Sequence, residues 1–399
     1  MREFASSPKR FARPPTRLMR TLIHLDERGR GLLSPLLLRP VLSYSDVMLR
    51  WRRRNTADPC HHKEDISAMR ANETRNQHFV SQVEQKLNAV NPDRASRKFR
   101  IYSFRLVDRE AYQIELETPR GRAIASNLSM LDLFSFDVPG GGRLRMNLEA
   151  LFHKYEKNVE THTRSLLAKL ATGSADLKAE IIDLFAAKLL NFVRNPFCIE
   201  KVLNSFPGVT AYEPIYPDLL AAYRLVAAGR KPHQARLCEQ LGISHETYDK
   251  WLRLLFILLM QTGDDRPNLF EGIIKGLFEA RNTQAAAFVW VYDQDHCLLS
   301  DRSFSQPIPD GPHMAMSFNL CSTAFVDYIF ADAATLVQDR APPEFVANAL
   351  AAWKQRPQAS INVTMTRNNS EMLARYNRRV IEQCRERVYC AAKTGLVLQ

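Results

Sequence analysis

The chain has 399 residues, of which 45% are hydrophobic and 25% are charged, as in globular proteins that bury a substantial core. Its formal net charge is +12, but residues 1–54 hold 13 Lys and Arg against 4 acidic residues, so the remaining residues carry only +3. This small charge excludes a polyanion-binding surface over the whole body. No apolar run reaches the ~18–20 residues of a membrane-spanning helix. The seven cysteines are never spaced as C-x-x-C. We therefore expect a cytoplasmic protein with reduced thiols.

Residues 1–70 are predicted to form a basic, disordered arm. Prolines within the first 15 residues oppose the amphipathic helix of a transit peptide. The run Arg50–Arg54 alternates cations with an aromatic ring, which suits a phosphate backbone or an anionic membrane surface. A second interpretation places the native start at Met69, so that residues 1–68 do not belong to the protein. A third gives the arm no dedicated function.

The body, residues 71–399, is expected to be a single domain that begins with a small pair of strands. Phe99–Leu106 is rich in aromatic and β-branched residues, which favour strands. Tyr112–Leu116 alternates apolar and polar residues and predicts a half-buried partner. Pro139–Gly142 predicts a loop.

Helices are predicted to dominate the middle of the chain. One runs from Asn147, as its N-cap, to Leu170 along an apolar stripe. Another runs from Asp176 to Arg194 and ends before Pro196, because proline cannot continue a helix. Further helical segments are predicted at 216–228, 233–262 and 272–279.

Strands are expected again near the C-terminal end. Residues 287–292 form an apolar run that predicts a buried strand, with 297–299 pairing back as a hairpin. A third strand is predicted at 314–320, and helices at 342–353 and 369–389. The fold class is therefore α+β, predominantly helical, with a small N-terminal strand pair and a later antiparallel hairpin or small sheet.

Residues 231–260 resemble a helix-turn-helix, with Gly242 in the turn and Ser244 capping the second helix. The second helix carries Glu246 and Asp249 as well as cations, and it runs into the apolar segment 254–260. A structural helix pair and a DNA-reading element are both open interpretations.

Short polar motifs recur along the body in a fixed order. They are Gln77-His78-Phe79-Val80-Ser81-Gln82, Leu148-Glu149, Tyr155-Glu156, Arg194-Asn195-Pro196, Leu299-Ser300-Asp301 and Tyr376-Asn377. Together they resemble the bacterial family called domain of unknown function 4238, over about residues 74–392. The resemblance implies a fold-sized unit and candidate polar residues, but no reaction. We expect the motifs to meet in one pocket.

The candidate catalytic residues are His78, Glu149, Glu156 and Asp301. A histidine near neutral pKa suits a general base, and Glu149 and Glu156 are also candidate ligands for Mg²⁺ or Mn²⁺. Each has a structural alternative, such as a capping histidine, a solvated helix face for the glutamates together with His153 and Glu160, or a turn-forming aspartate.

Phosphate binding is assigned to Arg194, Gln77 and Asn377. Arginine suits bidentate phosphate contacts, although Arg194 also stands where it would cap a helix dipole. These candidates predict a protein that acts on nucleic acid, as a metal-dependent nuclease or a toxin-like or defence-like effector. The alternative is a non-catalytic interaction protein or a DNA-binding regulator. The oligomeric state is not predicted.

Overall fold

The fold is taken from a computed structural model, which describes residues 74–90, 98–138, 144–174, 176–215, 217–261, 267–280, 283–294, 296–307, 313–338, 342–355 and 361–399. The arm predicted over residues 1–70 and the loop predicted at 139–142 lie outside these ranges. The fold is α+β, with about 47% helix and 24% strand. The strands form several sheets rather than one small pair and one hairpin.

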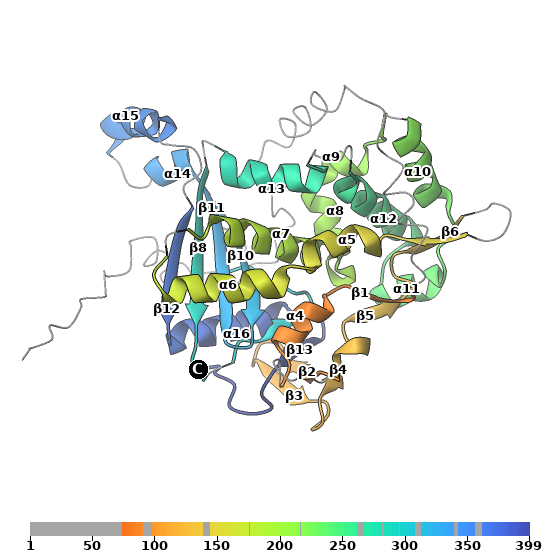
Figure 1. The fold of residues 1–399 in the computed structure, drawn as a ribbon, viewed down its shortest axis with the longest axis horizontal. Coiled ribbons are helices and arrows are strands. Elements are labelled where there is room, and N and C mark those ends of the chain that lie inside the picture. Colours follow the sequence, from red (N-terminus) through yellow and green to blue (C-terminus); the bar gives the residue numbers. More distant parts are fainter. Residues whose placement is uncertain are drawn as a thin grey trace, which may run out of the picture.

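A four-stranded sheet lies in the left half of the molecule in Figure 1. Its order is β10 (Met314–Cys321), β11 (Ala324–Asp332), β8 (Thr283–Val291) and β12 (Asn362–Arg367). The first three strands are antiparallel to one another, and β12 is parallel to β8. β11 and most of β8 and β10 are buried, because helices cover both faces of the sheet.

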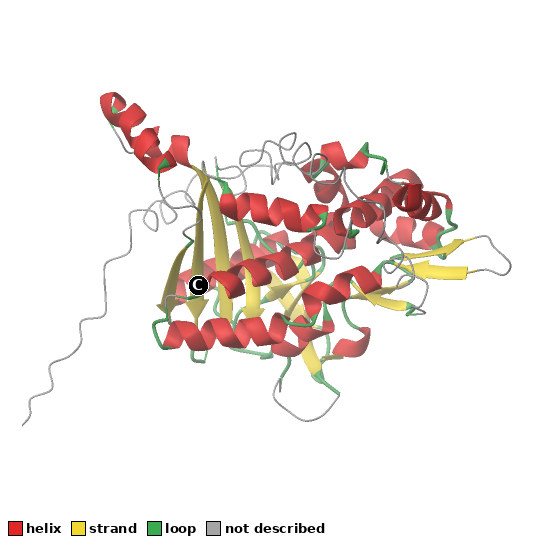
Figure 2. Ribbon diagram, turned by 45° about the horizontal axis from the view of Figure 1, so that its top comes forward, coloured by secondary structure: helices red, strands yellow, loops and turns green. Residues whose placement is uncertain are grey.

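One face of the sheet packs on α6 (Val159–Ala171), α7 (Lys178–Arg194) and α13 (Leu269–Glu279), as Figures 1 and 2 show. Phe185 of α7 lies at the centre of this layer. Its ring makes edge contacts with Tyr328 and Phe330 of β11 and with Phe278 of α13, at centroid distances of 4.9–5.4 Å. A continuous aromatic layer therefore joins α7 to the sheet.

The opposite face packs on α16 (Ser370–Gln383). Tyr376 of this helix stacks on Phe325 of β11, with ring centroids 4.0 Å apart and planes at 8°. The Tyr376 hydroxyl donates to the Leu298 carbonyl at 2.9 Å. α16 ends at Gln383, so the helix predicted to run to residue 389 is too long. The last residues instead form β13 (Arg387–Cys390).

A second sheet lies below the first in Figure 1. Its order is β3 (Gln113–Leu116), β2 (Arg100–Asp108), β13 and β9 (Leu299–Ser300), and β4 (Arg122–Ala123) also pairs with β2. The predicted strand pair is confirmed as β2 and β3. The predicted hairpin of 287–292 with 297–299 is wrong, because β9 pairs with β13 and β8 pairs with β11 and β12.

Short elements complete the N-terminal half of the described chain. They are β1 (Asn76–His78), α4 (Gln82–Leu87), a 3-10 turn (Ile124–Ser126), β5 (Ser129–Leu131), β6 (Ser135–Val138), β7 (Leu144–Asn147) and α5 (Glu149–Glu156). β1 pairs with β5, and β6 pairs with β7. The single helix predicted over 147–170 is divided into α5 and α6, because Lys157 and Asn158 interrupt the helix.

The remaining helices form the right-hand part of Figure 1 and its upper left edge. They are a 3-10 turn (Pro196–Cys198), α8 (Ile199–Ser205), α9 (Pro207–Thr210), α10 (Pro217–Ala228), α11 (Gln234–Leu241), α12 (His245–Leu259), α14 (Ala333–Gln338) and α15 (Pro343–Lys354). The helix predicted over 233–262 is the pair α11–α12, with Gly242 at φ +70° in its turn. None of the described helices is both long and apolar enough to span a membrane.

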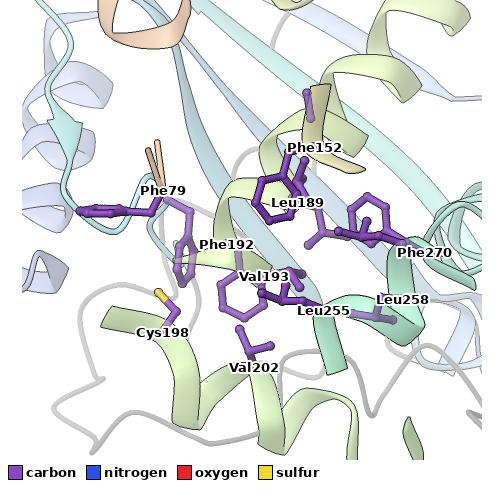
Figure 3. Packing of buried hydrophobic residues seen from close by; sticks show 14 of the residues in the cluster. Phe79, Phe152, Leu189, Phe192, Val193, Cys198, Val202, Leu255, Leu258 and Phe270 are labelled. Atoms are coloured by element: carbon purple, nitrogen blue, oxygen red, sulfur yellow. The ribbon is translucent and has the colours of Figure 1, made fainter. Parts of the chain in front are cut away.

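The core is densely packed around the C-terminal end of α7. Figure 3 shows Phe192 and Val193 of this helix among Phe79, Cys198, Val202 and Leu255. The Trp251 indole of α12 donates to the Val193 carbonyl at 2.9 Å. α7 therefore ends in a rigid apolar environment, which holds the polar residues of its last turns in place.

Candidate acid–base site

Arg194 is the last residue of α7, and its side chain is only 1% exposed. Its Nη2 lies 2.6 Å from Glu156 Oε1 of α5 and donates to Asn191 Oδ1 at 2.8 Å. The guanidinium also lies over the Phe152 ring, 5.0 Å from the ring centroid. A buried cation is thus held by one carboxylate, one amide and one aromatic face, as its desolvation requires.

α5 places Glu149 and Glu156 two turns apart on one side of the helix. The helix begins directly after β7, where Asn147 Oδ1 accepts the Glu149 backbone N–H at 3.0 Å. Glu156, at the other end, is 26% exposed and is the carboxylate that Arg194 binds. The two glutamates therefore share the field of the same buried arginine.

The Glu149 carboxyl group rests against β1. It accepts hydrogen bonds from the backbone N–H of His78 and from the Thr74 hydroxyl. Burial raises the pKa of Glu149 to about 7, with a further increase from Glu156, while the positive charge of Arg194 and the two hydrogen bonds oppose the rise. This side chain can therefore hold or release a proton near neutral pH.

His78 meets this carboxyl group through its backbone N–H, and its half-buried ring lies in the field of Arg194 and Glu156. Its Nε2 is 3.2 Å from the Ile124 carbonyl oxygen. Because a carbonyl only accepts, Nε2 carries the proton in the neutral ring and Nδ1 keeps the lone pair. Burial lowers the pKa of His78, and the charge of Arg194 lowers it further. The imidazole is therefore neutral in the range where Glu149 titrates.

A buried ion pair between Lys188 and Glu84 is linked to the site through Asn191. Lys188 Nζ lies 2.9 Å from Glu84 Oε2, and both side chains are 1% exposed. Glu84 Oε1 accepts from Asn191 Nδ2 at 2.5 Å, and Asn191 in turn accepts from Arg194. The sequence analysis does not predict this row of linked polar contacts. Its signal is that Lys188, Asn191 and Arg194 recur at i, i+3 and i+6 in an otherwise apolar helix, which indicates a buried polar row.

Four of the predicted site residues are therefore brought together: His78, Glu149, Glu156 and Arg194. Gln77 points the other way from β1, into the core. It is fully buried, donates to the Thr74 carbonyl and Ser135 Oγ, and accepts from the Phe134 backbone N–H. All of its contacts are within the fold, so the structure gives this amide a role in holding β1 to β6.

Asp301 lies outside this cluster. Its carboxylate accepts three backbone N–H groups, from Arg385, Glu386 and Arg387, at 2.7–2.9 Å. Its carbonyl accepts from Asn195 Nδ2 at 2.8 Å, which is its link to the end of α7. The carboxylate anchors the turn between α16 and β13, and it is 2% exposed as a residue.

Asn377 of α16 is likewise enclosed. Its Oδ1 accepts from the Leu298 N–H at 3.0 Å, and its Nδ2 donates to the carbonyls of His296 and Val397 at 3.1 and 3.0 Å. The side chain is fully buried. It joins α16 to the backbone of residues 296–298 and to that of Val397, which is a structural use of an amide.

The row of Glu149, His153, Glu156 and Glu160 does not lie on one helix, because α5 ends at Glu156. His153 is exposed, and Glu160 of α6 pairs with Lys86 at 2.9 Å. Within the described residues, no group of three His, Cys, Asp or Glu side chains is arranged to hold a metal ion. Metal binding by Glu149 and Glu156 stays a prediction.

A second polar group was not anticipated from the sequence. Asp132, 3% exposed, pairs with Arg145 of β7 and lies 3.5 Å from His233 Nε2. Asp132 and His233 both adopt left-handed backbone conformations, with φ of 61° and 58°. Such conformations are uncommon for residues other than glycine. The turns that contain them bring together side chains of separate loops, which no local sequence pattern connects.

A scan against protein-family models, a search of curated proteins and a search of solved structures each found no match.

Proposed function

We propose that the protein cleaves RNA by acid–base catalysis, with Glu149 and His78 as the proton-transferring pair. The observation that carries the proposal is a partly exposed carboxyl group with a pKa of about 7, seated on the backbone of a histidine whose pKa is lowered by burial. A carboxyl group that keeps its proton near neutral pH, beside an imidazole that stays neutral there, provides a general acid and a general base.

The reaction would be an internal transfer at the phosphodiester. The proton of the 2′-hydroxyl passes to His78 Nδ1, and the 2′-oxygen forms a bond to phosphorus. The bond from phosphorus to the 5′-oxygen breaks, and that oxygen takes the proton of Glu149. The products are a 2′,3′-cyclic phosphate and a 5′-hydroxyl, and the two side chains return to their starting protonation states through water.

Arg194 would act through its charge rather than as a clamp on the phosphate. Its side chain is 1% exposed and already binds Glu156 and Asn191. In a poorly hydrated site, a fixed positive charge favours the additional negative charge of the transition state. Glu156 holds the guanidinium in place, so we assign Glu156 a positioning role and Arg194 an electrostatic one.

The same pair of glutamates bound to Mg²⁺ or Mn²⁺ is the metal-dependent form of this proposal. It is less favoured, because Glu156 Oε1 is occupied by Arg194. The two forms differ in one simple property. Cleavage by the acid–base pair persists in chelator, whereas cleavage through a bound metal stops.

The test is cleavage of a labelled RNA oligonucleotide and its all-deoxy counterpart, with chelator and with Mg²⁺ or Mn²⁺. We expect cleavage of RNA alone, in chelator, with a 2′,3′-cyclic phosphate end. Glu149→Gln and His78→Ala should each slow it by about 10²–10⁴-fold. Glu160→Gln, on the neighbouring helix, is the matched control. Equal rates in wild type and both site variants would reject the proposal.

A non-catalytic interaction protein is the second candidate. Its support is that the side chains of Gln77, Asp301 and Asn377 form their hydrogen bonds within the fold. The α11–α12 pair would then be its docking element. The first turns of α12 are electrically mixed, with Lys250 paired to Glu246 at 2.6 Å, so a protein partner suits this surface better than DNA.

A further inference from the structure

The two edges of the four-stranded sheet differ in how they are covered. At one edge, β10 is bridged to the segment after β9, because Ser317 and Ser305 exchange backbone hydrogen bonds of 2.7 and 3.0 Å. The turn after β10 is also held, since the Ser322 N–H donates to the Leu87 carbonyl of α4 at 3.1 Å. This edge is therefore closed to a further strand.

The other edge, β12, is open over the described part of the chain. β12 pairs with β8 in unbroken parallel register from Asn362 to Arg367, and no other described strand adjoins it. Figure 1 shows it as the outermost strand on its side of the sheet. The N–H and C=O groups that point away from β8 are therefore available to a partner strand.

β12 lacks the features that keep an edge strand from pairing. Proteins block such edges with lysines, prolines, bulges or inward-pointing charges. Residues 361–366 read Ile-Asn-Val-Thr-Met-Thr and contain neither a charge nor a proline, and the register with β8 has no bulge. The single charge of the strand is that of Arg367 at its end, which pairs with Asp293 at 3.6 Å. Nothing in the composition of β12 opposes a second strand beside it.

The two faces of β12 differ in character. Val363 and Met365 pack against the core on the α7 side of the sheet, and both remain partly exposed. Thr364 lies between them on the opposite face and is exposed. The apolar pair therefore still has surface that a neighbouring strand would remove from water.

We infer that β12 pairs with β12 of a second copy of this chain, antiparallel and about a two-fold axis beside Thr364. An axis perpendicular to the sheet leaves each face on its own side. Thr364 then stands opposite its own copy, and Val363 stands opposite Met365 on both sides of the axis. Arg367 falls opposite Ile361, so apolar side chains meet on one face, threonines meet on the other, and no like charges face each other.

This register favours a second copy over an unrelated peptide, because one short sequence meets itself without a mismatch on either face. The contact involves six residues from each chain, which is few beside the roughly 20–30 residues per partner of a standard interface. We therefore expect a weak dimer that depends on protein concentration. The inference does not depend on the proposed cleavage of RNA.

The test is sedimentation equilibrium of the full chain at increasing protein concentration. The average mass of wild type should rise towards that of two chains. Thr364→Lys and Thr364→Glu each place two like charges opposite one another at the axis, and each should weaken dimerisation by about tenfold or more. Gln113→Lys, at an exposed position of β3 on the edge of the second sheet, is the matched control and should dimerise as wild type does.

A mixture of the two Thr364 variants gives the sharpest result. Thr364 is exposed, so neither new charge is buried within a single chain. A Thr364→Lys chain and a Thr364→Glu chain bring opposite charges together at the axis, so an equal mixture should form dimers at concentrations where neither variant does alone. A wild type that stays monomeric at every concentration, dimers that persist in both variants, or a mixture that stays monomeric would each overturn the inference.

Discussion

Replacing Glu149 by Gln should stabilise the protein at alkaline pH, although it removes the group proposed to be catalytic. Burial raises the pKa of this carboxyl from its ordinary value of 4.5 to about 7 in the folded protein. Between these two values the folded state binds more protons than the unfolded chain. The free energy of unfolding therefore falls as pH rises from about 4.5 to 7, and the loss is complete above 7.

The size of the effect follows from the difference between the two states. At 1.36 kcal/mol per pKa unit, a rise from 4.5 to about 7 corresponds to about 3 kcal/mol as an upper bound. The side chain is partly exposed, so water screens part of this cost, and we expect about 1–2 kcal/mol. Glutamine keeps an oxygen that accepts from His78 N–H and the Thr74 hydroxyl, and it carries no charge to desolvate.

The assay is urea denaturation of wild type and Glu149→Gln at pH 4 and pH 8. We expect equal stability at pH 4 and a more stable variant at pH 8. Glu156→Gln is the opposite control, because it removes the carboxylate that pairs with the buried Arg194 and should destabilise at pH 8. A Glu149→Gln variant that is less stable at pH 8, or whose difference does not change with pH, would refute the reasoning.

Three further tests use urea denaturation: two concern buried polar contacts, and the third concerns a close backbone approach at a glycine. Lys188→Met leaves Glu84 as an unpaired buried charge and should lower the free energy of unfolding by about 3–5 kcal/mol. A second substitution, Glu84→Gln, should restore most of this loss. If the effects of the two substitutions simply add in the double variant, the pairing is contradicted. Asp301→Asn replaces an acceptor of three backbone N–H groups and should lower the free energy of unfolding by about 2–3 kcal/mol. A loss below roughly 0.5 kcal/mol, the size typical of surface substitutions, would count against its anchoring role. Gly121→Ala combines a φ of +65° with a Cβ only 2.8 Å from the Ile101 carbonyl, whereas Gly173→Ala has a similar φ and open space, so the first should be the more destabilising; equal costs would show that contact with Ile101 is unimportant.

Local pattern was sufficient where neighbouring residues determine structure. The β2–β3 pair follows from alternation and turn residues close in sequence, and the end of α7 follows from Pro196. The helix predicted over 147–170 extended an apolar stripe across Lys157 and Asn158, where the helix breaks. Periodicity gives the buried face of a helix more reliably than its ends.

Strand pairing over long distances was not predictable in this way. Local pattern pairs β9 with the preceding strand, but its partner β13 is nearly 90 residues further along the chain. β13 itself falls within the helix predicted over 369–389, although Val388 and Tyr389 are typical strand residues. β12, a polar edge strand, has too few apolar residues to stand out.

The candidate site is only partly predictable for the same reason, because its contacts join residues far apart in the sequence. His78, Glu149, Glu156 and Arg194 converge, whereas Asp301 belongs to a different contact. In sequence, Asp301 resembles a catalytic aspartate after a strand. Its backbone partners lie more than 80 residues away, and only the folded chain shows that they occupy both carboxylate oxygens.

The proposed catalysis depends most on the proton held by Glu149 near neutrality. Carboxyl-carbon NMR titration of the protein labelled at glutamate, with Glu149→Gln to assign the signal, measures it directly. We predict a midpoint near pH 7 for Glu149 that rises further when Arg194 is replaced by Met, because a nearby positive charge is removed. A midpoint at the ordinary value of a glutamate, unchanged in that variant, would contradict the account.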